Sequence, residues 1–235
     1  KENVLSRPEY LKNLSENHKI IGITGTHGKT STTALLSHIF HFNNVNVSYL
    51  YGGITTFNGI GGHYGDPDQP LILETDEAFN TFEKIKISDL LVLNVDSDHL
   101  DYFKNLDNYK DAFYKVMKNV TDNLVINNDD LNIKSMKELK NPVSYGKDIA
   151  ADFKVQSPGT FIYENNKYEI KSDIIGDHFK ANMLGAIILA LLNGIEIKDS
   201  LNAIESFAGV KRRIELIGIS TVSYTHLTLP TSNGV

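Results

Sequence analysis

Short apolar runs alternate with longer amphipathic stretches along this chain. Short continuous apolar runs are typical of strands in a parallel sheet, because helices cover such a sheet on both faces. Apolar residues three or four positions apart indicate helices with one buried face. The predicted strands cover residues 18–24, 46–51, 71–74, 90–95 and 123–127. The predicted helices cover residues 8–14, 29–42, 106–120, 131–139, 178–192 and 197–207.

A different pattern occurs in the third quarter of the chain. Residues 153–156, 160–164 and 167–171 are strand-like, and Asn165 and Asn166 separate the last two stretches. Asparagines between two such stretches favour a tight hairpin turn, so we predict a small antiparallel section. The alternation of strands and helices elsewhere predicts an α/β fold with a mostly parallel sheet flanked by helices.

The composition is that of a folded globular protein, with 41% hydrophobic and 22% charged residues among 235. The absence of cysteine excludes disulfides, thiolate metal sites and cysteine nucleophiles. A net charge of −6 argues against a nucleic-acid partner held by a basic surface. No apolar stretch reaches the roughly 18 residues that a membrane span needs, and no export signal is visible. We therefore expect a soluble, cytoplasmic protein, whose oligomeric state the sequence leaves open.

The last residues, 221–235, need separate treatment. Residues 222–231 carry no charge and do not continue the amphipathic period of the preceding segment. Codons can be assigned to them that spell, in one frame, the transposon adapter of short-read sequencing libraries. We therefore expect that the natural sequence ends at about Ser220 and that residues 221–235 are a sequencing artefact.

A glycine-containing loop follows the first predicted strand and begins the first long helix. Its consecutive residues are Gly25, Thr26, His27, Gly28, Lys29, Thr30 and Ser31. In this position glycines let backbone N–H groups turn toward phosphate oxygens, and the helix N-terminus adds partial positive charge. Lys29 would contact the outer phosphates, and the Thr30 hydroxyl would bind Mg²⁺. The loop predicts a nucleotide site, with Ile23 where the strict motif has a further glycine.

Two acidic segments follow strands of the same predicted sheet. Glu74 ends the run 71–74, and Asp98, His99 and Asp101 follow the run 90–95. Ligands bind at the carboxyl ends of strands in an open parallel sheet, so both segments should face the loop. Carboxylate and imidazole groups there can hold the cations that neutralise a triphosphate.

Together with the shortened loop, these segments resemble the Mur ligase family. The resemblance implies that Thr30 and Glu74 bind one Mg²⁺ and that His99 binds a second. Asp98 and Asp101 could equally orient His99 by hydrogen bonding to its imidazole without binding the metal themselves.

Two later motifs fit the same resemblance. The run from His178 to Asn182 lies where the family has a His-Asn pair and, three residues later, another asparagine. Phe179 replaces the first asparagine, so the family's side-chain contact to adenine is not carried over to this position, whereas Asn182 stays in register as a candidate for the nucleotide site. Arg212 and Arg213 are two of only three arginines in the chain, which indicates a need for the planar guanidinium. By the resemblance, Arg213 would contact the ATP phosphates.

The resemblance implies an ATP-dependent amide-bond ligase of peptidoglycan precursor synthesis. Its expected small-molecule substrates are UDP-N-acetylmuramate, L-alanine and ATP, with Mg²⁺ as the metal and an acyl phosphate as the intermediate. The implied catalytic residues are Lys29, Glu74 and His99. Two alternatives stay open, namely a tripeptide-recycling member of the family and an inactive ATP-binding fragment. The related folate-polyglutamate ligases are disfavoured by His27 in the loop.

The resemblance also implies a domain organisation. Residues 1–17 would be the remnant of an N-terminal UDP-sugar domain, and residues 18–215 the central ATP-binding domain. Residues 216–220 would begin the linker to a C-terminal domain.

Overall fold

The computed structural model describes residues 5–53, 59, 61–76, 84–96, 103–136, 139–210 and 214–215. Their main feature is one 10-stranded sheet in the order β10-β9-β8-β7-β6-β5-β1-β4-β2-β3. The strands β2, β4, β1, β5, β6, β7 and β8 run parallel, and antiparallel pairs add β3 at one edge and β9 and β10 at the other. The strands are β1 (Ile20–Thr24), β2 (Ser48–Leu50), β3 (Gly62–His63), β4 (Leu71–Glu74), β5 (Asp89–Val92), β6 (Asn123–Asn127), β7 (Val143–Gly146), β8 (Phe153–Ser157), β9 (Thr160–Tyr163) and β10 (Asn166–Glu169).

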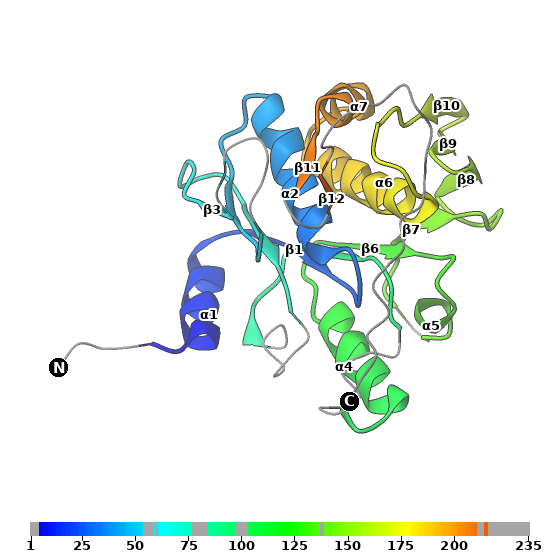
Figure 1. The fold of residues 1–235 in the computed structure, drawn as a ribbon. Helices are drawn as coiled ribbons and strands as arrows, with labels where there is room; N and C mark the ends of the chain where they lie inside the picture. Colours follow the sequence, from blue (N-terminus) through cyan, green and yellow to red (C-terminus); the bar gives the residue numbers. More distant parts are fainter. Residues whose placement is uncertain are drawn as a thin grey trace, which may run out of the picture.

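Helices cover both faces of this sheet (Figure 1). One group lies on the face above the sheet in Figure 1, and the other lies below it. The upper group comprises α2 (Lys29–Phe42), α6 (Asp177–Leu192) and α7 (Ile197–Glu205). The lower group comprises α1 (Arg7–Asn17), α4 (Leu106–Lys118) and α5 (Leu131–Lys134). A separate pair of short strands, β11 (Gly209–Val210) and β12 (Ile214–Glu215), pairs antiparallel.

The two faces of the sheet form two hydrophobic cores. Along β1, Ile21 and Ile23 pack into the core between the sheet and the upper helices α2, α6 and α7. Ile20 packs into the core between the sheet and the lower helices α1 and α4. This alternation follows from the two-residue period of a strand. Burial on both faces explains why the central strands are apolar at almost every position.

The fold class expected from the sequence is confirmed, and most of the predicted elements are present with small shifts at their ends. Two expectations were wrong. The predicted helix 131–139 is only the single turn Leu131–Lys134. The hairpin turn lies at Glu164 and Asn165, which both have left-handed φ values (47° and 63°), so that Asn166 already belongs to β10. The short strands β3, β7, β11 and β12 were not predicted.

The order of the strands creates a crevice at the carboxyl end of β1. From β1 the chain passes through α2 to β2, on one side, whereas from β5 it passes through α4 to β6, on the other. The connections that leave β1 and β5 therefore diverge. In open α/β sheets, such a switch point is where ligands bind.

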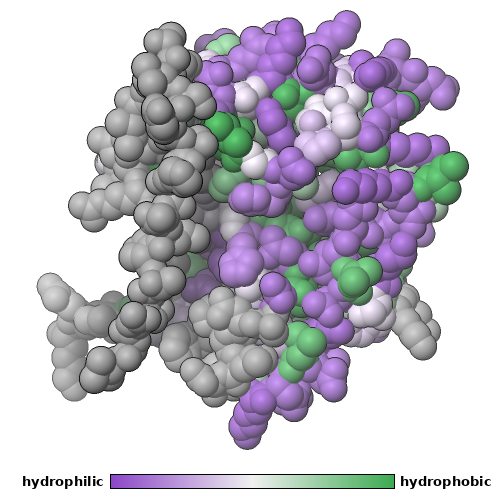
Figure 2. Space-filling view, turned by 45° about the vertical axis from the view of Figure 1, so that its right-hand side comes forward, coloured by the Kyte–Doolittle hydropathy of each residue, from purple (hydrophilic) through white to green (hydrophobic). Residues whose placement is uncertain are grey.

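Where its residues are described, the face that Figure 2 shows is mostly hydrophilic. On the face that Figure 2 shows, hydrophobic side chains are scattered among hydrophilic ones rather than gathered in one patch. Scattered apolar side chains of this kind are normal for a globular protein. In the described ranges, no helix has the length and apolar character that crossing a membrane requires.

A buried aspartate joins four segments at the N-terminal end of the parallel strands, away from the crevice. Asp89 is fully buried, and its Oδ1 accepts hydrogen bonds from the backbone N–H (3.1 Å) and the side-chain amide (2.7 Å) of Asn123. Its Oδ2 accepts from the amide of Asn193 at 3.0 Å and lies 3.0 Å from Nζ of Lys19. One carboxylate thus links β5, β6, the end of α6 and the residue before β1.

We expect Asp89→Ala to lower the free energy of unfolding by about 3–5 kcal/mol, because it leaves buried donors without their acceptor. Urea unfolding followed by circular dichroism would measure the change. Asp122→Ala is the control, since Asp122 is 47% exposed and lies 3.7 Å from the same lysine. Its expected effect is within about 0.5 kcal/mol. An equal loss of unfolding free energy in the two variants would contradict the structural role that we assign to Asp89.

Candidate functional site

The loop between β1 and α2 has a backbone that only glycine adopts readily at two of its positions. Gly28 caps the N-terminus of α2 with a left-handed φ of 88°, and Gly25 has a φ of 142°. The first turn of α2 carries no acidic side chain. The partial positive charge of the helix N-terminus therefore stays available to a bound anion.

Helix α6 approaches this loop so closely that a Cβ atom at position 28 would force the Asn182 side chain to move. A Cβ atom built on Gly28 would lie 2.3 Å from Nδ2 of Asn182. Asn182 is itself buried, at 8% exposure. Two segments more than 150 residues apart in the sequence thus meet at the N-terminus of α2.

The ammonium group of Lys29 lies against its own loop. Nζ donates hydrogen bonds to the carbonyl oxygens of Gly25 at 2.7 Å and Thr26 at 3.4 Å. The positive charge is thereby held at the same turn whose glycines and helix N-terminus favour an anion.

Two oxygen-bearing side chains and one backbone amide meet beside the loop. The hydroxyl of Thr30 donates to Oε1 of Glu74 at 2.7 Å, and the N–H of Gly52 donates to Oε2 at 2.6 Å. Hydroxyl and carboxylate oxygens are the ligands that Mg²⁺ prefers. In the described part of the chain, no three His, Asp or Glu side chains gather as a ready metal site.

Asn94 lies just after β5, and its side-chain amide binds the backbone of the loop. Its Nδ2 donates to the carbonyl of His27 at 2.9 Å, and its Oδ1 accepts from the N–H of His27 at 2.8 Å. The carbonyl of Asn94 also accepts from the N–H of Thr26 at 3.1 Å. Sequence reasoning gave Asn94 no role. Its place at the end of the strand predicted over 90–95 was the only signal that could have indicated one.

A cavity of about 560 Å³ opens beside the loop. The loop and β5 supply one wall, and the first turns of α6 supply the other. The rings of His178 and Phe179 have centroids 3.9 Å apart. The lining residues are His27, Gly28, Ser31, Asn94, His178, Phe179 and Asn182.

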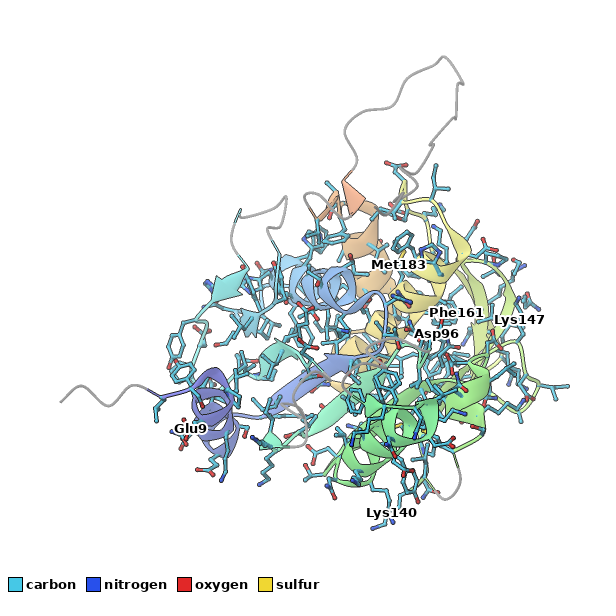
Figure 3. The ribbon with its side chains drawn as sticks, turned by 60° about the horizontal axis from the view of Figure 1, so that its bottom comes forward. Glu9, Asp96, Lys140, Lys147, Phe161 and Met183 are labelled. Atoms are coloured by element: carbon cyan, nitrogen blue, oxygen red, sulfur yellow. The ribbon has the colours of Figure 1, made fainter. Side chains whose placement is uncertain are left out.

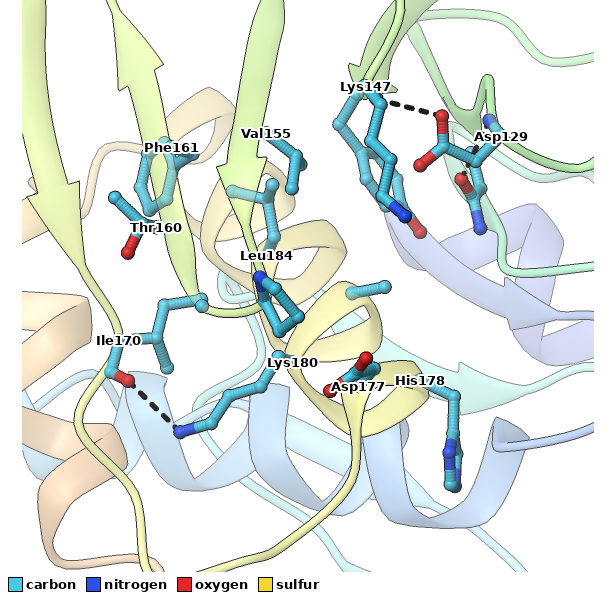
Figure 4. A pocket seen from close by; sticks show the side chains of 15 residues that line it. Asp129, Lys147, Val155, Thr160, Phe161, Ile170, Asp177, His178, Lys180 and Leu184 are labelled. Atoms are coloured by element: carbon cyan, nitrogen blue, oxygen red, sulfur yellow. Dashed lines mark hydrogen bonds between the residues drawn. The ribbon is translucent and has the colours of Figure 1, made fainter.

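A smaller cavity, of about 200 Å³, lies between α6 and the antiparallel section and shares His178 with the first (Figure 4). Lys180 reaches across it to donate to the carbonyl of Ile170 at 3.0 Å. Burial lowers the pKa of Lys180, an effect that Asp173 and Glu169 oppose. Burial also raises the pKa of Tyr145, whose hydroxyl is enclosed and has no hydrogen-bond partner among the described residues.

The structure brings together the predicted site residues that it describes. The loop residues Gly25 to Ser31 are contiguous, Glu74 is bonded to Thr30, and Asn182 touches Gly28. The other predicted residues lie outside the described residues: His99, Arg213, and the neighbouring Asp98, Asp101 and Arg212.

A comparison with protein families matches residues 23–190 to the Mur ligase middle domain. The matched segment covers most of the chain and includes the loop, Glu74, Asn94 and Asn182. The chain belongs to the Mur ligase family.

Curated relatives of this Mur ligase chain include UDP-N-acetylmuramate–L-alanine ligases. That of Clostridium botulinum strain Hall is 37% identical over 230 residues, and that of Dictyoglomus turgidum is 32% identical over 229 residues. Each alignment covers 92% of this chain, and the chain spans about half the length of these relatives (50% and 49%).

Solved structures show the same fold. The UDP-N-acetylmuramate-alanine ligase of Thermotoga maritima superimposes with a TM-score of 0.72 at 26% identity, covering 87% of this chain and 48% of its own. A murein peptide ligase of Psychrobacter arcticus gives a TM-score of 0.71 at 22% identity, covering 91% and 52%.

We expect Gly28→Ala to destabilise the protein by roughly 2–5 kcal/mol. Left-handed backbone costs a residue with a Cβ roughly 1–2 kcal/mol, and overpacking against Asn182 adds about 1–3 kcal/mol. Urea unfolding would measure the loss. Gly194→Ala is the matched control, because Gly194 has a φ of 90° with no atom within 4 Å of the added Cβ.

An Asn182→Ala background removes the clash, so Gly28→Ala should then cost no more than Gly194→Ala does. If the two glycine variants already lose the same stability in the wild-type background, the close approach of α6 is not what requires glycine at position 28.

Proposed function

We propose that this chain is the ATP-binding part of a ligase that joins L-alanine to UDP-N-acetylmuramate. The observation that carries the proposal is the contact between Thr30 and Glu74 beside a phosphate loop, within the segment matched to the Mur ligase middle domain. The names of relatives at 32–37% identity support L-alanine as the amino acid. A solved ligase of Neisseria meningitidis, named for joining UDP-N-acetylmuramate to L-alanyl-γ-D-glutamyl-meso-diaminopimelate, is only 23% identical, and at that level the likeness concerns the fold alone.

The residues of the site fit a nucleotide triphosphate with magnesium. Positive φ values at Gly25 and Gly28 allow the loop backbone to turn around phosphate oxygens, and Lys29 lies at the same turn. Thr30 and Glu74 offer neighbouring oxygen ligands to Mg²⁺. His99 as a ligand of a second Mg²⁺ and Arg213 as a phosphate contact remain proposals from the family pattern.

When bound, ATP supplies the phosphoryl group that activates the substrate carboxylate toward the amine of alanine. The work of this chain is then positioning and charge neutralisation. Lys29 would neutralise phosphate charge at the loop, and Glu74 would orient Thr30 while its second oxygen stays held by the N–H of Gly52. Asn182 and Phe179 would form the wall of the cavity that receives the nucleoside end.

The proposed domain limits follow from the family pattern. Residues 18–215 would form the ATP-binding domain, with residues 1–17 left from the preceding sugar-binding domain and residues 216–220 beginning the next linker. The treatment of residues 221–235 as a sequencing artefact also remains a proposal, which resequencing of the source locus would test.

The direct test measures ATP-dependent phosphate release with UDP-N-acetylmuramate and L-alanine, beside ATP binding with Mg²⁺. Release that requires both substrates is the expected result for the protein that carries this chain. Release with the tripeptide but not with alanine would move the assignment to the recycling reaction. Binding without any release would mean that the chain acts as a nucleotide-binding module.

We expect Lys29→Ala to lower turnover at least ~100-fold, since the loss of one preorganised charge at a site of developing negative charge typically has this effect. Steady-state phosphate release would measure it. Lys154→Ala is the control, because Lys154 is an exposed lysine on β8. Near-normal turnover in Lys29→Ala would refute the role of the loop.

A further inference from the structure

The hydroxyl of Thr26 makes three hydrogen-bond contacts at the crevice. It accepts from the N–H of Asp96 at 2.8 Å and donates to the carbonyl of the same residue at 3.3 Å. Its third neighbour is the hydroxyl of Tyr109 at 3.0 Å. Either hydroxyl can be the donor in this third contact. The three contacts tie Thr26 to both Asp96 and Tyr109.

Tyr109 reaches the loop from the far side of the sheet. It belongs to α4, which covers the face opposite α2, and its side chain is fully buried. The rings of Phe103 and Phe113 contact its ring edge-to-face, each with a centroid separation of 5.0 Å. The aromatic packing fixes the direction of the hydroxyl. In Figure 3, Asp96 lies between the ribbons of α2 and α4.

The loop is therefore held from outside at two successive residues. Asn94 binds both polar groups of the His27 backbone, and the Tyr109–Thr26–Asp96 contacts bind the residue before it. Asp96 also lies three residues before His99 in the sequence.

We propose that Tyr109 is a positioning residue for the nucleotide site, whose hydroxyl acts through Thr26 to hold the phosphate loop ready for the triphosphate. Tyr109 does not line the cavity beside the loop and acts without touching the ligand. A loop that is already ordered loses less entropy when phosphate binds, and its N–H groups need no rearrangement. The inference rests on the proposed nucleotide binding.

The chain supplies a matched control for removing this hydroxyl. Tyr145 is also fully buried, but its hydroxyl has no partner among the described residues. Tyr109→Phe and Tyr145→Phe therefore delete the same atom from equally buried rings, and only the first deletes the hydrogen bond to Thr26.

The affinity of the 235-residue chain for ATP with Mg²⁺, measured by isothermal titration calorimetry, tests the proposal. We expect Tyr109→Phe to weaken binding about fivefold, the effect of losing one hydrogen bond, and Tyr145→Phe to leave it unchanged. Thermal unfolding of each variant provides the comparison with stability. A purely structural role would lower the melting temperature and leave the affinity of the folded protein unchanged, which would overturn the proposal.

A double-mutant cycle tests whether Tyr109 affects ATP binding through Thr26. Thr26→Ser keeps the hydroxyl and should preserve the fivefold effect of Tyr109→Phe. Thr26→Val keeps the shape but removes the hydroxyl, so Tyr109→Phe should then have no further effect. Full additivity in the Val background would show that Tyr109 does not act through Thr26.

A measurement without ligand separates this proposal from the proposed function. Lys29→Ala should abolish ATP binding; if wild-type and Lys29→Ala chains behave alike toward ATP, the proposed function fails. In that case, amide hydrogen exchange observed by NMR still decides the positioning role. Faster exchange at Asp96 and His27 in Tyr109→Phe, but not in Tyr145→Phe, would support it, and unchanged exchange would overturn it.

Discussion

The parallel pairing of β1 with β4 on one side and β5 on the other is the constraint on which the site depends. In this register Ile23 lies beside Glu74, and Thr24 beside Val92. The residues that follow β1 therefore emerge between the carboxylate of Glu74 at the end of β4 and the side-chain amide of Asn94 just after β5. The phosphate loop has no regular structure of its own and takes its shape from these neighbours and from α6.

A fully hydrogen-bonded buried carboxylate and the candidate site lie at opposite ends of the parallel strands. At the edge where the strands begin, Asp89 joins four segments through a fully bonded buried carboxylate. At the other edge, glycines in left-handed backbone and a lysine folded over its own loop form a site that favours an anion. Buried charge with complete hydrogen bonding resists local opening, whereas the loop must remain open to a ligand.

Sequence patterns predicted the fold and much of the site because both depend on local rules. The apolar run 71–74 identified β4 with its bounds, and the position of Glu74 at the end of that strand followed from how parallel sheets bind ligands. The helix predicted over 106–120 contains Tyr109, yet periodicity cannot show that its hydroxyl reaches Thr26. The hairpin turn was misplaced because Glu164 adopts a left-handed conformation that asparagine usually favours.

The contact between Gly28 and Asn182 has a consequence for protein engineering. Because Asn182 of α6 lies against Gly28, a shift of one residue in the register of α6 would bring Ala181 or Met183 to that position instead. Chimeric ligases that exchange the antiparallel section between family members would therefore need splice points that conserve the rotational phase of α6. Chimeras that shift this phase would place the wrong side chain against the nucleotide loop, even when every strand is retained.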